Sequence, residues 1–169
     1  MVMRVTFRRP NFVAEGKRLE RDLRKRILNQ LIAALNDFQD SIMQTPVYTG
    51  KTLVNYRWSL GSPVEGLRPA VKDPDLPGTT SEMSIGTEPR RKANAVPVVT
   101  EFRAMIAELR QTQNPYVGIY LTNNVPYFTE VEYGTYSTSA GHSVRTPPGG
   151  MTRRGEALLV SQVKGLRKR

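Results

Sequence analysis

Residues 15–44, with the sequence EGKRLERDLRKRILNQLIAALNDFQDSIMQ, carry the strongest periodic signal in the chain. Apolar residues recur there every three or four positions, as on one face of a helix: Leu19, Leu23, Ile27, Leu31, Leu35, Phe38 and Ile42. No proline or glycine interrupts residues 17–44, so the stretch predicts a single helix about 42 Å long. A compact domain of this size has a radius of gyration of about 15 Å. The helix should therefore cross the domain or project beyond it, which favours an oligomer, unless it bends or splits near Asn29 or Asn36.

The rest of the chain alternates short strand and helix signals with long loops. We expect strands at 55–60 (NYRWSL) and 116–123, a helix at 98–111, one or two helical turns at 126–133 and a terminal helix at 151–164. Residues 61–97 are rich in proline and glycine and predict a long loop insertion, with at most a short strand at 83–87. A second loop at 134–150 and a basic tail at 165–169 complete the chain.

This order of elements predicts an α+β fold. In it, a long N-terminal helix and a C-terminal helix pack on a small, mainly antiparallel sheet with long loops. The length of 169 residues predicts a single domain spanning residues 1–169.

The composition narrows the functional classes. The chain has no cysteine, one histidine and a formal net charge of +10. The absence of cysteine excludes disulfides and thiolate metal sites and favours a reducing compartment. No apolar run is long enough to span a bilayer, and residues 1–10 do not resemble a signal peptide. We therefore expect a soluble protein that is made inside the cell.

The positive charge is concentrated at the two ends of the chain. Residues 1–30 hold nine Lys/Arg and three acids, and residues 145–169 hold seven Lys/Arg and one acid, so each end carries +6. The 114 residues between them carry −2. Such asymmetry predicts contact with a polyanion, and the alternative is a solvated helix face with a basic tail.

The sequence offers no convincing catalytic or cofactor-binding motif. His142-Ser143 lies in a loop without the elbow that a nucleophilic serine needs. Glu130 and Glu132 form an acidic pair, but no second acidic cluster completes a metal site. Neither GxxxxGK[ST] nor GxGxxG occurs. We therefore expect that the protein is not an enzyme, that it has no catalytic residue, and that it binds no metal and no cofactor.

Two groups of basic residues are candidate contacts with DNA or an acidic partner. Arg18, Arg21 and Lys25 share one face of the first helix at spacings that suit phosphate contacts. The basic C-terminal region adds Arg153, Arg154, Arg167, Lys168 and Arg169. No base-reading motif follows, so any DNA contact should be non-specific.

Two segments resemble the tailed-phage tail-completion, or neck (head–tail joining), proteins, the family that includes minor tail protein Z. Residues 45–53 (TPVYTGKTL), followed by Trp58, are similar to the Pro-Val-Asp-Thr-Gly-basic-Leu…Ser-Trp signature of that family. Residues 117–135 resemble its Val-x-Asn…Pro-Tyr-Ala…Val-Glu-Phe-Gly-Thr stretch. The matching positions are Pro46, Thr49, Gly50, Leu53, Trp58, Asn123, Pro126, Tyr127, Glu132, Gly134 and Thr135.

The chain departs from the family pattern at four places. Tyr48 stands where the family has Asp, and Lys51-Thr52-Leu53 stretches the basic-Leu pair. The connection at 61–97 is longer than usual, and the usual aromatic-Leu-Arg-Pro-Ala entry to the last helix is absent.

The resemblance implies a virion structural protein of the neck whose motif residues are a scaffold. It implies a homo-oligomeric ring of six or twelve copies that joins or completes the tail around the DNA channel. Adjacent connector, terminator or tail-tube proteins would be its partners, with assembly in the host cytoplasm and no membrane. The alternatives are a tail terminator protein and a non-specific nucleic-acid-binding basic protein.

Overall fold

The computed structural model describes residues 12–43, 51–70, 88–133, 135, 152–153, 155–157 and 160–161. Its elements in chain order are α1 (Phe12–Ile42), α2 (Lys51–Val54), β1 (Arg57–Leu60), α3 (Glu88–Thr112), β2 (Ile119–Thr122) and α4 (Phe128–Tyr133). Residues 152–153, 155–157 and 160–161 are also helical. The predicted α+β class is confirmed, with a small antiparallel sheet beside long helices.

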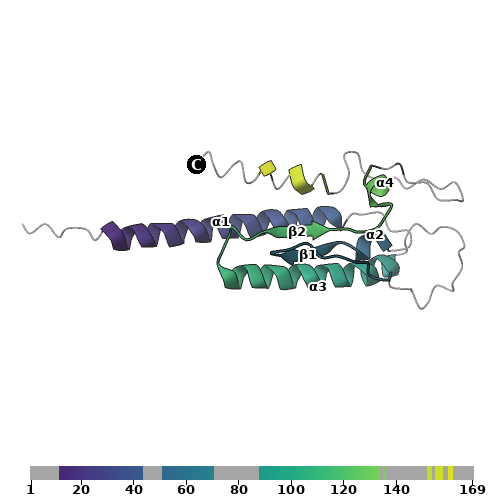
Figure 1. Ribbon diagram of the computed structural model, residues 1–169, viewed down its shortest axis with the longest axis horizontal. Helices are drawn as coiled ribbons and strands as arrows, with labels where there is room; N and C mark the ends of the chain where they lie inside the picture. The colour runs from purple at the N-terminus through teal and green to yellow at the C-terminus, as the bar shows by residue number, and fades with distance from the viewer. Residues whose placement is uncertain are drawn as a thin grey trace, which may run out of the picture.

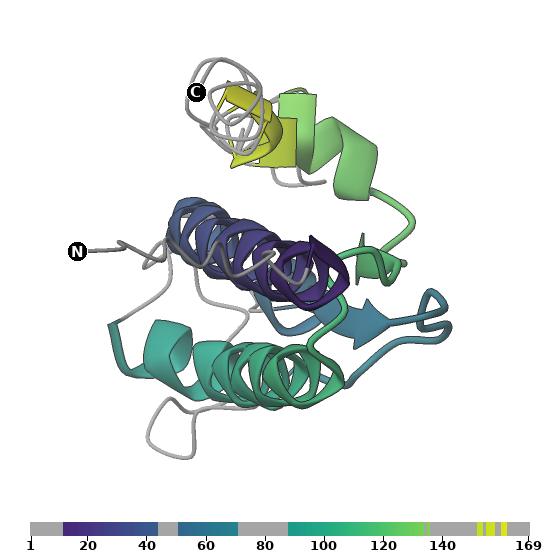
Figure 2. The same cartoon turned by 90° about the vertical axis from the view of Figure 1, so that its left-hand side faces the viewer.

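Two long helices and a two-stranded sheet form the body of the structure. In Figure 1 the strands lie between α1 and α3, with α2 at one end of the sheet. Viewed end-on in Figure 2, α4 and the helical residues after 151 lie on the side of α1 away from α3. The strands pair antiparallel, with Arg57 opposite Thr122 and Leu60 opposite Ile119. Within the described residues, no helix is both apolar enough and long enough to cross a membrane.

Helix α1 is continuous, so the predicted single helix is confirmed and the alternative of a split near Asn29 or Asn36 is wrong. One face of its second half is buried against the rest of the fold, whereas residues 13–26 are all exposed. Figure 1 shows this first half extending past the ends of α3 and of the sheet. The expectation of a projecting helix is therefore confirmed.

The apolar face of α1 differs from the one predicted. Leu19 and Leu23, expected to face the core, are 69% and 58% exposed. A row of residues four apart drifts by about 40° per step on a helix of 3.6 residues per turn, so the predicted row winds around α1. Leu35 and Ile42 of that row do reach the core, on a face completed by Leu28, Ile32 and Gln39.

Helix α3 begins ten residues before the predicted start at 98, so the loop prediction is wrong for residues 88–97. Pro97, which was expected to end a loop, lies inside the helix and leaves one backbone carbonyl without its amide donor. Asn94 and Val98 on either side of it are fully buried, and Phe102 follows one turn later. Burial of these neighbours offsets the proline. The predicted strand at 83–87 lies outside the described residues.

Candidate functional site

The described parts of the two segments that carry the family resemblance, residues 51–53 with Trp58 and residues 117–133, meet in the structure. Trp58 of β1 lies opposite Leu121 of β2. Asn123, just after β2, donates from Nδ2 to the Thr52 carbonyl at 2.9 Å, and its Oδ1 accepts the Val125 amide at 3.3 Å. The predicted residues Leu53, Trp58 and Asn123 therefore belong to one packed unit, which we call the junction.

Trp58 is the centre of the junction and is only 3% exposed. Its indole Nε1 donates to Gln39 Oε1 at 2.7 Å. Its ring contacts Phe38 edge-on, with centroids 5.7 Å apart, and Phe102 at 5.2 Å. One side chain thus joins α1, β1 and α3, with both its apolar surface and its polar hydrogen satisfied.

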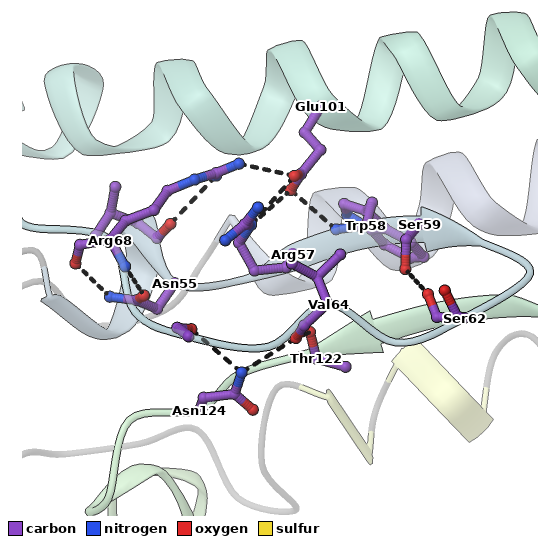
Figure 3. Close-up of polar contacts among 12 residues, drawn as sticks. Asn55, Arg57, Trp58, Ser59, Ser62, Val64, Arg68, Glu101, Thr122 and Asn124 are labelled. Atoms are coloured by element: carbon purple, nitrogen blue, oxygen red, sulfur yellow. Dashed lines mark hydrogen bonds and ion pairs between the residues drawn. The ribbon is translucent and has the colours of Figure 1, made fainter.

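A carboxylate on α3 anchors the backbone and side chains of β1 (Figure 3). Glu101 accepts Arg57 Nε at 3.1 Å and Arg68 Nη2 at 2.7 Å on Oε1. Its Oε2 accepts the Trp58 amide at 3.0 Å. These three ionised side chains are each about one-fifth exposed, so their charges are only partly screened by water.

The chain that follows β1 is held by side-chain amides, as Figure 3 shows. Asn55 is fully buried and makes two bonds with Arg68, accepting its amide at 2.6 Å and donating to its carbonyl at 3.0 Å. Thr122 and Asn124 both donate to the Val64 carbonyl, at 3.0 and 3.1 Å. Residues 61–70, the first ten of the predicted loop insertion, are therefore hydrogen-bonded to the segments that contain the two strands.

Sequence reasoning missed five polar residues of the junction: Gln39, Asn55, Arg57, Arg68 and Glu101. One signal was available for Glu101. It lies three residues after Val98 and one before Phe102, on the buried side of a helix, where an acid requires a partner. Nothing in the sequence identifies that partner, because Arg57 and Arg68 come from another part of the chain.

The remaining motif residues lie at or near α4. Pro126 and Thr135 are exposed, and Tyr127 is half-buried. Glu132 is buried and accepts the Arg153 amide at 3.2 Å on Oε1, while its Oε2 has no hydrogen-bond partner among the described residues. Pro46, Thr49, Gly50 and Gly134 lie outside the described residues.

Arg153 fastens the C-terminal helical residues to α4. Its guanidinium donates to the Tyr133 hydroxyl at 2.6 Å and stacks 4.6 Å over that ring. It therefore makes a local contact rather than joining Arg18, Arg21 and Lys25, which are exposed on the projecting half of α1. The other predicted basic contacts, Arg154, Arg167, Lys168 and Arg169, lie outside the described residues.

Gly155 brings the C-terminal helical residues against α1. It is buried, and a Cβ atom placed on it would collide with the ring of Phe38. Only a residue without a side chain permits this close approach.

Gly155→Ala should therefore loosen this contact, at an overpacking cost of about 1–3 kcal/mol. Limited trypsin digestion should then cut after Arg153 faster than in the unsubstituted protein. Gly16→Ala is the matched control, because nothing lies within 4 Å of the Cβ it would add. Equal cutting rates in Gly155→Ala and Gly16→Ala would contradict the contact.

The charged groups at the centre of the junction are paired with one another. The Glu101 carboxylate is occupied by three donors. Among the described residues, no group of three or more His, Asp or Glu side chains is placed to hold a metal ion. His142 lies outside the described residues.

Comparison with known proteins yields no relative: no family model, no curated protein and no solved structure matches this chain.

Proposed function

We propose that this chain is a structural subunit of the neck of a tailed bacteriophage, forming a ring at the head–tail junction that joins or completes the tail around the DNA channel. One observation carries the proposal. The two segments that resemble the neck family are about 60 residues apart in the sequence, and their described parts pack together through Trp58, Leu121, Asn123 and Thr52. Packing of the two segments in one unit is what a shared family signature requires.

The roles of the residues packed around Trp58, which we called the junction of the fold, agree with this proposal. They hold strands and helices in place through buried aromatic contacts and paired charges. A subunit that works by its shape needs such rigidity and needs no reactive group. Its proposed partners are other copies of itself and the connector, terminator or tail-tube proteins of the same particle.

The experiment is to purify virions of the phage that encodes the chain and to identify the protein in them by mass spectrometry. A cryo-EM map of the neck should then show it as a ring of six or twelve copies, and its position distinguishes a tail terminator from a neck protein. A protein that is abundant in the infected host but absent from virions would overturn the proposal.

The alternative, a free nucleic-acid-binding protein, draws on the exposed Arg18, Arg21 and Lys25. It requires strong, salt-dependent binding of duplex DNA by the isolated protein. Failure of micromolar protein to shift duplex DNA at low salt would reject this alternative.

A further inference from the structure

The projecting half of α1, residues 13–26, is a helix surface with no covering among the described residues. Every residue in it is exposed, and Figure 1 shows it beyond the end of α3. It nevertheless carries three large apolar side chains, Val13, Leu19 and Leu23, which are 70%, 69% and 58% exposed. Leu19 and Leu23, four residues apart, share one side of this isolated helix, and adjacent exposed leucines of this kind are typical of a contact surface.

Charge divides α1 into two unlike halves. Residues 13–26 hold six basic and three acidic residues. Residues 27–43 hold two acids, Asp37 and Asp40, and no base. Both acids are exposed and lie three residues apart, so they share one side of the helix. The helix therefore presents a basic surface at one end and an acidic surface at the other.

We propose that the projecting half of α1 in one copy docks on the acidic half of α1 in the next copy. Leu19, Leu23 and Arg26 form one row at spacings of four and three, and this row is the docking face. Its target is the outer row of Ala33, Asp37 and Asp40, at spacings of four and three. The leucines then contact Ala33, and Arg26 pairs with an aspartate of the neighbouring copy.

This inference rests on the proposed ring function and specifies the surfaces that would build the ring. In a ring, each copy offers its projecting half to one neighbour and its acidic half to the other, so the contact is head-to-tail. A head-to-tail contact repeats from copy to copy and closes into a ring when the rotation permits. Reciprocal pairing of the same two halves between two antiparallel copies of α1 would instead stop at a dimer.

A second copy fits this surface better than DNA does. Three of the nine charged residues in 13–26 are acids, and one of them, Glu20, pairs with Arg24 at 2.7 Å. Acids repel phosphates, and exposed leucines gain nothing from a phosphate backbone. A partner helix with two acids and a small apolar residue satisfies both features.

The absence of native cysteine allows a direct test by disulfide trapping. Leu23→Cys combined with Ala33→Cys places the only two thiols of the chain on the two docking surfaces. Ten residues of helix separate them by about 15 Å, too far for a bond within one chain. Under mild oxidation of the full-length protein, we expect a ladder of dimers, trimers and higher species.

The control pair is Leu23→Cys with Val96→Cys, since Val96 is 61% exposed on α3 and lies outside the proposed contact. The proposed pair should cross-link at least about tenfold more than the control pair, as expected for thiols held together rather than meeting by collision. Equal cross-linking of the two pairs, none in either, or dimers without higher species overturns the inference.

Charge reversal provides an independent arm in the same cysteine background. Arg26→Glu should lower the yield of cross-linked species by about tenfold, and Asp40→Lys added to it should restore most of that yield. Ser substitution of Leu19 should lower the yield as well. A ladder that requires added duplex DNA and disappears on nuclease treatment would assign the surface to nucleic acid and overturn the inference.

The outcomes separate this inference from the proposed function. Rings in virions together with no cross-linked ladder would leave the neck function standing and remove only this contact. A protein absent from virions would remove the neck function even if the ladder forms.

Discussion

Trp58→Ala is expected to lower the free energy of unfolding by about 4 kcal/mol, close to the full stability of many small domains. The indole ring is 3% exposed and fills the space between Phe38 and Phe102. Its removal opens a cavity among three elements that α1, β1 and α3 cannot all close at once. It also leaves Gln39 Oε1 buried without its donor, which adds a desolvation cost.

The measurement is urea unfolding followed by far-UV circular dichroism, since the substitution removes the only tryptophan. Trp58→Phe is the matched control. It keeps a ring between Phe38 and Phe102 but loses the donor to Gln39 and part of the indole volume, so we expect a smaller loss of about 1–2 kcal/mol. If Trp58→Ala costs no more than Trp58→Phe, the ring is not the centre of the core.

The helix signal of residues 15–44 was sufficient to predict α1. Apolar residues at helical spacing, with no proline or glycine in residues 17–44, are typical of a long helix. The two strands were also predictable from their β-branched and aromatic residues, although each is shorter than expected. These are local properties of the sequence. Which side of α1 is buried was not predictable in the same way, because Leu19 and Leu23 belong to the pattern but not to the core.

The start of α3 could not be predicted because local and tertiary preferences disagree there. Pro97 disfavours a helix locally, whereas burial of Asn94 and Val98 in the core stabilises the helical conformation. The same holds for the polar part of the junction. Asn55 and Arg68 are thirteen residues apart, and Glu101 lies thirty-three beyond Arg68. A sequence read for periodicity carries no signal for pairings made only in the folded chain.

Glu101→Ala is the second large effect that we expect, a loss of about 2–3 kcal/mol in the free energy of unfolding. Removing one partner of a buried pair costs about 3–5 kcal/mol, and exposure of one-fifth lowers that value through solvent screening. The loss has three parts. Arg57 loses its counter-ion, Arg68 loses the same counter-ion, and the Trp58 amide loses its acceptor.

Two companion variants separate these parts. Glu101→Gln retains an acceptor for the Trp58 amide and loses the charge, so its cost should fall between those of the native protein and Glu101→Ala. Glu108→Ala, on an exposed part of the same helix, controls for helix propensity and should change stability by less than about 0.5 kcal/mol. Adding Arg68→Ala to Glu101→Ala should cost less than the two single losses combined, because it removes a cation that the first substitution leaves unpaired. If Glu101→Ala and Glu108→Ala unfold at the same urea concentration, the carboxylate does not hold β1 on α3, and the aromatic contacts of Trp58 alone must do so.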